Sequence, residues 1–216
     1  MDYILLAEQF FNGFQLGIIL FLVAAGLTLI FGIMDLVNLA HGTLYMFGAF
    51  FAATFVQLTD SLVLGMILTL PAMLIAGLIL ELSVLRTLYE RDHLDQVLAT
   101  FGLIIFFNEL FLIVWGAEGT GINLPPYLSG LITLPGGITV PDYRVVIIIS
   151  GLLVAVLLYL LVSKTRIGML IRAGASNREM VGALGINIKL LFTLVFGLGA
   201  VLAGFAGMII TPITQA

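Results

Sequence analysis

The sequence predicts an all-α fold, a polytopic transmembrane helical bundle. Of its 216 residues, 62% are hydrophobic and only 9% are charged, whereas soluble globular domains carry about 25% charged residues. This composition leaves too few polar side chains to cover a surface in water. The apolar runs are long and continuous, so they favour helices over the alternating segments of about ten residues that build a transmembrane barrel.

Six stretches are expected to span the membrane, because about 20 apolar residues are needed to cross a hydrocarbon core of about 30 Å. Five runs have this length: Phe14–Ile33, Leu62–Leu85, Leu94–Trp115, Val145–Val162 and Leu190–Ile210. The N-terminus carries Asp2 and Glu8 and lacks the basic region of a cleaved signal peptide, so the first run should remain as a span. The sixth stretch, Gly42–Val56, is shorter and follows a segment with polar residues, so we expect a short or broken span there.

The distribution of Lys and Arg predicts the orientation, since these residues are enriched in cytoplasmic loops. Loop 163–189 contains five of the eight Lys and Arg residues, and loop 86–93 contains two more. Both loops are therefore expected in the cytoplasm, and the acidic N-terminus and loop 116–143 are expected outside.

The external loop 116–143 is expected to contain a short hairpin. Leu131–Leu134 and Ile138–Val140 have strand-like composition and flank Pro135-Gly136-Gly137, which favours a turn. Such an element is either a lid folded over the helix ends or a docking site for an external partner.

Within the cytoplasmic loop 163–189 the sequence predicts a short helix with two defined ends. Ser176 and Glu179 are three residues apart, as the N-cap and third residue of a capping box are. Asn177 and Arg178 lie between them, and Gly185 provides a C-terminal stop. An isolated helix shorter than about 12 residues is only marginally stable in water, so we expect this one to dock against another protein.

Polar residues between the first two spans are candidates for a solute path. Asp35, Asn38 and His41 are three apart, so on a helix they would share a sector of about 120°. A charge at mid-membrane costs roughly 2.5–3.5 kcal/mol, so such groups should face a cavity, a partner side chain or the interface. The segment, with Gly42 after it, either lines a translocation path, as interrupted spans do in transporters, or forms an ordinary turn at the inner surface. Glu109 in the fourth span is a second path candidate, or it is hydrogen-bonded between packed helices.

The sequence contains none of the usual enzyme motifs. There is no HExxH, GxSxG or GxGD motif, no Walker A motif and no dinucleotide-binding fingerprint. The chain has no cysteine, and His41 has no second ligand at a usable spacing, so no metal site is expected. We therefore expect no catalytic residue, no cofactor bound by this chain and no nucleic acid partner.

Several motifs occur together along the chain in an order that is typical of one known family. They are Gly26–Met34, Asn38–Gly42, Leu98–Leu103, Lys164–Ala173, Asn177–Asn187 and Gly199–Gly207. In this combination the chain resembles the permease subunits of branched-chain amino acid ABC importers, over nearly its whole length.

The resemblance implies a single transmembrane permease domain over residues 1–216 in a bacterial inner membrane. It implies that Ser176–Asn187 is a coupling segment, with Ser176, Asn177, Arg178, Glu179 and Gly185 at the contact with a cytoplasmic ATPase. Further partners implied are a second homologous permease, an external solute-binding protein and the lipid bilayer, with ATP used by the ATPase subunits. Such permeases generally continue for about 80 more residues, the length of two to three further helices with their loops, so the chain is expected to lack the family's C-terminal spans.

The function expected on this basis is inward transport of branched-chain or related amino acids, driven by the partner ATPase. Two alternatives remain open. One is an ion-coupled secondary transporter of a small solute that uses Asp35 and Glu109. The other is an ABC importer permease for urea or short amides.

Overall fold

The computed structural model describes residues 3–116, 121–134 and 138–214. Its elements in chain order are α1 (Tyr3–Met34), α2 (His41–Thr59), α3 (Leu62–Ser83), the 3₁₀ turn η1 (Leu85–Leu88), α4 (His93–Trp115), the 3₁₀ turn η2 (Pro126–Leu128), β1 (Leu131–Leu134), β2 (Ile138–Pro141), α5 (Asp142–Lys164), α6 (Arg166–Ser176), α7 (Arg178–Ala183) and α8 (Ile188–Thr214). Within these residues six helices, α1 to α5 and α8, are long and apolar enough to cross a membrane. The expected all-α polytopic bundle is confirmed.

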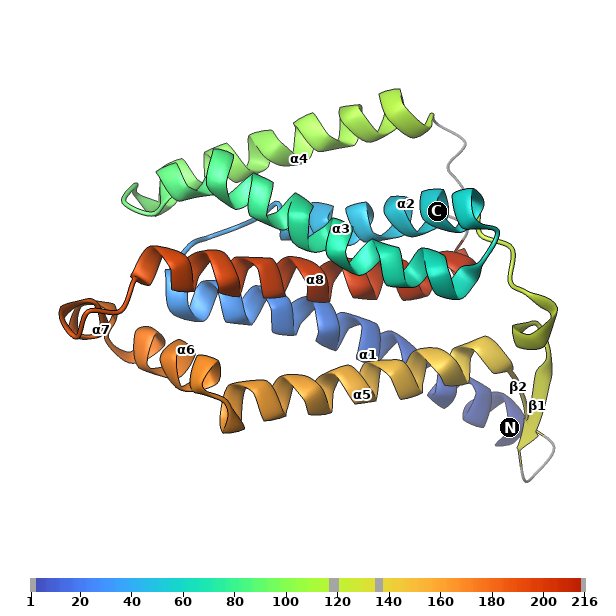
Figure 1. Cartoon of the computed structure of the whole chain (residues 1–216). Helices are drawn as coiled ribbons and strands as arrows, with labels where there is room; N and C mark the ends of the chain where they lie inside the picture. Colours follow the sequence, from blue (N-terminus) through green and yellow to red (C-terminus); the bar gives the residue numbers. More distant parts are fainter. Residues whose placement is uncertain (1–2, 117–120, 135–137, 215–216) are drawn as a thin grey trace.

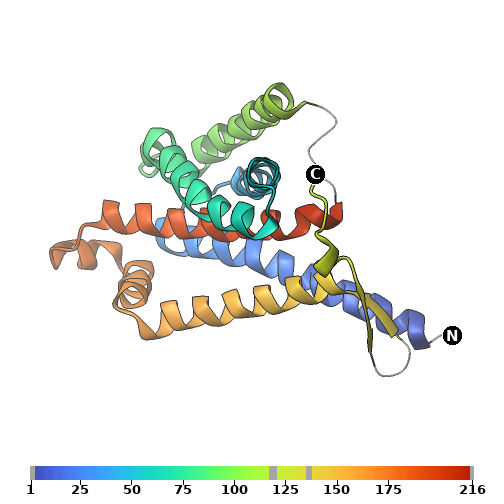
Figure 2. The same cartoon turned by 45° about the vertical axis from the view of Figure 1, so that its right-hand side comes forward.

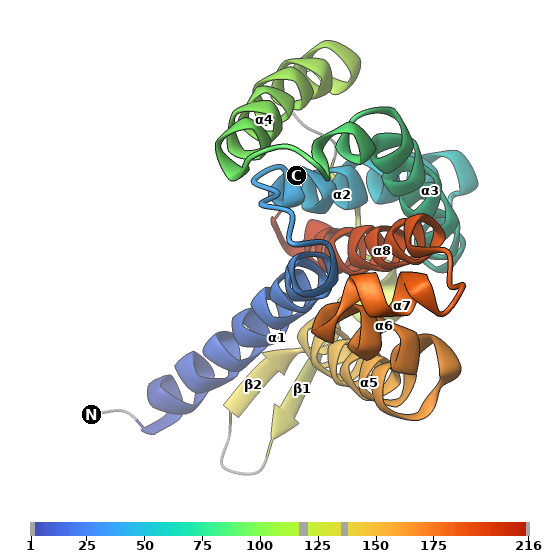
Figure 3. The same ribbon diagram turned by 90° about the vertical axis from the view of Figure 1, so that its left-hand side faces the viewer.

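Helix α8 lies at the centre of the bundle. It packs against α1, α2 and α3, with α1, α5 and α6 on one side and α2, α3 and α4 on the other (Figure 1). The most apolar stretch of α8 is 67% buried, whereas that of α4 is only 11% buried. Viewed along the bundle, α4 stands at the edge farthest from α5 (Figure 3). The described chain is therefore organised around α8, and α4 is its least enclosed helix.

The two ends of the bundle differ in their connections. The β-hairpin and both chain termini lie toward one end, which we call the hairpin end, while η1, α6 and α7 lie at the other (Figures 1 and 2). Residues 86–91 and 164–189, at that other end, contain seven of the eight Lys and Arg residues, so we call it the basic end.

The hairpin is confirmed as predicted. Strands β1 and β2 pair antiparallel, with Leu131 opposite Pro141 and Leu134 opposite Ile138. The turn expected at residues 135–137 lies outside the described residues. At this end the Tyr143 hydroxyl donates to the Ile209 carbonyl at 2.9 Å, which ties α5 to α8.

Small residues bring α8 close to its neighbours, as the glycines and alanines of the last span predict. A Cβ at Gly48 of α2 would overlap the backbone of Gly204 in α8. A Cβ at Gly199 would lie 2.6 Å from Ile30 Cδ1 of α1. Backbones therefore meet directly at these crossings.

The structure corrects the expectation that loop 163–189 contains only one helix. Residues 166–176 form α6, whose first turn is capped by Thr165, with its Oγ1 accepting from the Gly168 N–H at 3.0 Å. Ile171 and Gly174 are buried, and a Cβ at Gly174 would lie 3.0 Å from Ile33 of α1. The helix is amphipathic and is stabilised by this packing against the end of α1, which the local sequence does not reveal.

Replacing Gly48 by alanine should destabilise the bundle. The new Cβ would meet backbone rather than a movable side chain, and overpacking of this kind typically costs about 1–3 kcal/mol. The thermal unfolding midpoint in detergent should fall for Gly48→Ala. The control is Gly102→Ala on α4, where a Cβ would meet nothing within 4 Å. Equal midpoints for the two variants would show that the α2–α8 contact is looser than described.

Candidate functional site

The chain leaves helical geometry between α1 and α2. Helix α1 ends at Met34, and Asp35 follows in the left-handed region with φ 52°. We call residues 35–40 the linker. Asp35, Asn38 and His41 therefore do not share one helical face, because the left-handed Asp35 follows the end of α1 and His41 is the first residue of α2.

The linker returns into the bundle rather than turning at its surface. His41 Nε2 lies 3.1 Å from the Val23 carbonyl oxygen of α1. Val23 lies about three turns before Met34, or roughly 16 Å along α1 at 1.5 Å per residue. The alternative of an ordinary turn at the end of the bundle does not fit this depth.

A glycine of α1 makes room for the imidazole beside the crossing with α8. A Cβ at Gly26 of α1 would lie 3.2 Å from His41 Nε2 and 2.8 Å from the Gly199 oxygen of α8. A side chain at Gly26 would crowd the ring, and a Cβ at Gly199 would lie 3.0 Å from the Gly26 oxygen. The histidine therefore sits where α1 and α8 approach most closely.

Buried polar atoms around the linker lack partners. Asn38 is 5% exposed and His41 is 3% exposed, and neither the Asn38 amide nor His41 Nδ1 has a hydrogen-bond partner among the described residues. A buried polar group without a partner costs about 1–3 kcal/mol. Gln15, on α1 and closer to the hairpin end, likewise has a buried Oε1 without a described partner. Sequence reasoning missed this residue. These atoms are available to water or to a polar solute.

Two backbone N–H groups of the linker are satisfied by side chains of α4. The Val37 N–H donates to Gln96 Oε1 at 3.0 Å, and the Leu39 N–H donates to Thr100 Oγ1 at 3.3 Å. Gln96 and Thr100 are 3% and 0% exposed. Neither residue was singled out from the sequence, because nothing local indicates that a distant backbone is their partner.

The remaining path candidates are placed differently. Gly42 is exposed in the first turn of α2, and a Cβ there would meet nothing within 4 Å. Glu109 is exposed on α4, more than two turns beyond Thr100 toward the hairpin end. The structure therefore brings Asn38, His41 and Gly42 together but does not bring Glu109 to them.

The coupling segment forms a short helix with both ends defined, but its N-cap is not Ser176. Ser176 is the last residue of α6, and Asn177 caps α7 by accepting from the Met180 N–H through its Oδ1 at 2.9 Å. Glu179 is thus in the first turn, where a carboxylate is favoured by the helix dipole. The capping-box prediction is wrong by one residue because α6 continues up to Ser176.

The predicted stop at Gly185 is confirmed. Gly185 has φ 84°, and its N–H donates to the Gly182 carbonyl at 2.9 Å. The Ile186 N–H donates to the Val181 carbonyl at 3.4 Å. This pair of bonds is the Schellman arrangement, in which a left-handed glycine ends a helix.

The coupling segment presents an exposed surface at the basic end. All five predicted coupling residues are exposed: Ser176, Asn177, Arg178, Glu179 and Gly185. Val181 is buried and holds α7 to the bundle, whereas Met180 and Leu184 are 59% and 74% exposed. An open cleft of about 400 Å³ lies between residues 174–179 and the end of α1. Exposed apolar side chains beside polar ones are typical of a protein contact.

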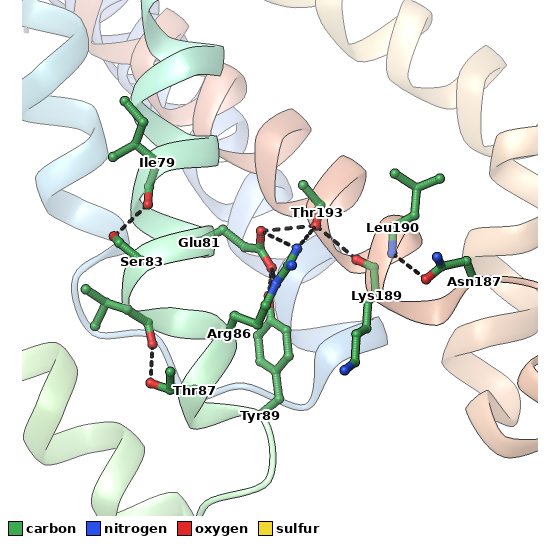
Figure 4. Close-up of polar contacts among 11 residues, drawn as sticks. Ile79, Glu81, Ser83, Arg86, Thr87, Tyr89, Asn187, Lys189, Leu190 and Thr193 are labelled. Atoms are coloured by element: carbon green, nitrogen blue, oxygen red, sulfur yellow. Dashed lines mark hydrogen bonds and ion pairs between the residues drawn. The ribbon is translucent and has the colours of Figure 1, made fainter.

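A buried cluster joins three elements next to this surface. Glu81 of α3 is fully buried, and Arg86 donates to it from Nε at 3.2 Å and from Nη2 at 3.3 Å (Figure 4). The Tyr89 hydroxyl donates to Glu81 Oε1 at 2.6 Å, and Thr193 Oγ1 of α8 lies 3.0 Å from Oε2. We call these four residues the Glu81 cluster.

The protonation of Tyr89 suits this arrangement. Burial, and secondly the hydrogen bond to the Glu81 carboxylate, raise the pKa of Tyr89 well above its ordinary value of 10. The hydroxyl therefore remains a donor at neutral pH. The cluster fixes the start of α8 to α3 and to the loop after η1.

No metal centre is found in the part of the chain that the structure describes. There, no three His, Cys, Asp or Glu side chains lie close enough together to hold an ion.

Comparisons with known proteins agree on one family. A family described as the permease component of the branched-chain amino acid transport system matches residues 9–216. The chain is 29% identical to the high-affinity branched-chain amino acid transport system permease protein BraD of Pseudomonas aeruginosa, over 94% of this chain and 70% of that protein. It is 27% identical, with the same coverage of both chains, to the corresponding permease protein LivH of Escherichia coli. No solved structure matches the chain.

Removal of one hydroxyl should test the Glu81 cluster. In Tyr89→Phe the buried carboxylate loses a short hydrogen bond, and bonds to charged groups are typically worth about 1.5–3 kcal/mol. The thermal unfolding midpoint in detergent should fall. Tyr127→Phe is the control, because Tyr127 is 65% exposed. If both variants unfold at the wild-type temperature, the cluster contributes nothing to stability.

Proposed function

Because the chain belongs to the permease family of branched-chain amino acid transport systems, we propose that it forms the membrane pathway for branched-chain or related amino acids in an ATP-driven importer. The chain is a multi-pass membrane protein, and the family supports the role of an ABC importer permease rather than that of an ion-coupled transporter. The relatives are named as transport permeases, not as enzymes.

The observation that carries the proposed path is the linker deep in the bundle. A zwitterionic amino acid cannot cross hydrocarbon without polar partners, and the uncommitted atoms of Asn38 and His41 offer an amide and an imidazole. In hydrocarbon, irregular backbone is tolerated where it is covered by protein or lines a wet cavity. The unpartnered polar atoms and the non-helical backbone together support a path along the linker and the start of α2, with Asn38, His41 and Gly42 as lining residues. Glu109 on the exposed face of α4 contributes only where a further subunit covers that face.

The proposed partners follow from the two ends of the bundle. The concentration of Lys and Arg supports a cytoplasmic basic end, where an ATPase subunit would bind the coupling segment. Two such subunits in the assembly would hydrolyse the ATP. The N-terminus and the hairpin would then face outward, where an external solute-binding protein delivers its cargo. A second homologous permease would complete the membrane core in the bacterial inner membrane. This chain would bind no cofactor itself.

The geometry suggests how closure of the two ATPase subunits on ATP would move the residues that line the proposed solute path. Helix α7 is rigidly capped at both ends, and α8 begins directly after its stop, with Asn187 Oδ1 accepting from the Leu190 N–H at 3.1 Å (Figure 4). A push on α7 therefore moves the start of α8. Since α8 packs on α1, α2 and α3, its displacement changes the space around the linker.

A second candidate substrate class is a neutral amide such as urea. The unpartnered Asn38 side chain can donate to and accept from such a solute as readily as from an amino acid. Uptake of labelled leucine in the presence of excess urea or excess valine separates the two. Competition by valine alone supports the amino acid.

A charge reversal on α7 should release the ATPase. In Glu179→Lys a positive charge replaces the carboxylate in the first turn of an exposed helix, which opposes the helix dipole and alters the proposed contact. The amount of ATPase subunit that co-purifies should fall at least about tenfold, a difference of about 1.4 kcal/mol in binding. Glu90→Lys is the matched control, since Glu90 is also exposed at the basic end. Normal co-purification with Glu179→Lys would refute the proposed ATPase contact.

Single cysteines should reveal the path, because the chain has none of its own. Asn38→Cys and His41→Cys should react with a small water-soluble thiol reagent in the assembled transporter, and a non-hydrolysable ATP analogue should change the rate. Ala53→Cys is the control at a fully buried position of α2 and should stay unreactive. If Asn38→Cys and His41→Cys are as inert as the control in every state, the solute passes elsewhere.

A further inference from the structure

Gln96 uses the whole hydrogen-bonding capacity of its side chain. Its Oε1 accepts from the Val37 N–H of the linker at 3.0 Å and lies 3.3 Å from His93 Nδ1. Its Nε2 donates to the carbonyls of Leu88 at 3.2 Å and Arg91 at 3.1 Å. One amide therefore joins the linker to the loop that follows η1.

That loop is fixed in turn to the start of α8. Tyr89 lies between the two carbonyls that Gln96 binds, and its hydroxyl donates to Glu81 at 2.6 Å. Glu81 contacts Thr193 of α8 at 3.0 Å, and Arg86 donates to Thr193 at 2.8 Å. Hydrogen bonds, joined through the backbone of residues 88–91, thus connect the first turns of α8 with the linker residue next to Asn38.

The remaining contacts of α4 lie elsewhere along the helix. Toward the hairpin end, α4 meets α2 through aromatic pairs such as Phe47 with Phe111, whose ring centroids are 4.8 Å apart. Trp115 also donates to Thr54 at 2.9 Å. Helix α4 is therefore held independently at that end, so loss of Gln96 should break the link between the linker and residues 88–91 without detaching the helix.

We propose that Gln96 is a positioning residue for solute movement. It holds the linker in a fixed position relative to the Glu81 cluster, so that a displacement of α8 also moves Asn38 and His41. Thr100, one turn further along α4, accepts from the Leu39 N–H and helps to hold the linker in the same position. The inference rests on the proposed function, because it requires that the coupling segment moves α8 and that the linker lines the path.

The test uses the assembled transporter with its ATPase subunits and a reporter cysteine at position 38. The rate of Asn38→Cys modification is measured with and without a non-hydrolysable ATP analogue, in chains with Gln96 or with Gln96→Met. Methionine keeps the length of the side chain but removes every hydrogen bond of the amide. Gln57→Met, at an exposed position of α2, is the matched control.

With Gln96 present, nucleotide should change the modification rate by at least about fivefold, the lower end of ordinary coupling between sites. In Gln96→Met the ratio should fall close to one while the ATPase subunits still bind. In chains without the reporter, the number of ATP molecules hydrolysed per solute taken up should rise for Gln96→Met only. A purely structural role for Gln96 would instead lower the yield and leave this ratio unchanged.

The outcomes separate the inference from the function it rests on. An unchanged nucleotide response in Gln96→Met overturns the role of Gln96 but leaves the path intact. The absence of a response even with Gln96 overturns the proposed path, and the inference with it. If Gln96→Met does not assemble, Gln96→Glu keeps an acceptor for the Val37 N–H but removes the amide donor to the Leu88 and Arg91 carbonyls. A full nucleotide response in that variant overturns the inference.

Discussion

A backbone that stops being helical inside a bundle must find new partners for its N–H and C=O groups. The linker is the place where this constraint acts most strongly, because residues 36–40 belong to neither helix and lead to His41, whose ring contacts the Val23 carbonyl. Gln96 and Thr100 supply the acceptors for two of its N–H groups. Gly26 supplies the room for the imidazole that follows. The Gln96 and Thr100 contacts of α4 and the glycine at position 26 of α1 are thus tied to one non-helical segment inside the bundle.

The central position of α8 links packing with mechanism. The same helix carries the small residues that let α2 and α1 approach, begins directly after the coupling segment, and contacts Glu81 through Thr193. Closely packed interiors do not deform continuously, so an applied displacement shifts packed elements as units. A helix in contact with α1, α2 and α3 can therefore transmit movement at one end to the site where those helices meet.

The sequence was sufficient where a local signal decides the structure. Long apolar runs gave the six spans, and the composition around residues 131–140 gave the hairpin. Gly185 also ends its helix as expected. The N-cap was misplaced because Ser176 and Asn177 are both good caps, and the choice between them depends on α6 packing against Ile33. The roles of Gln96 and Thr100 could not be predicted, since their partners are backbone groups about 60 residues away. The depth of His41 was equally hidden, because a polar segment does not reveal whether it turns outward or back into the bundle.

The long separation between the linker and α4 also has a consequence for biosynthesis. Val37 and Leu39 leave the ribosome 59 and 61 residues before the side chains that accept from them. At about 5–20 residues per second, this is a delay of roughly 3–12 s. By the end of that interval α1, α2 and α3 have been made, but α8 has not. The linker of the nascent chain must therefore stay in contact with water or with the insertion machinery. The interior of the bundle closes only after α8 has been made.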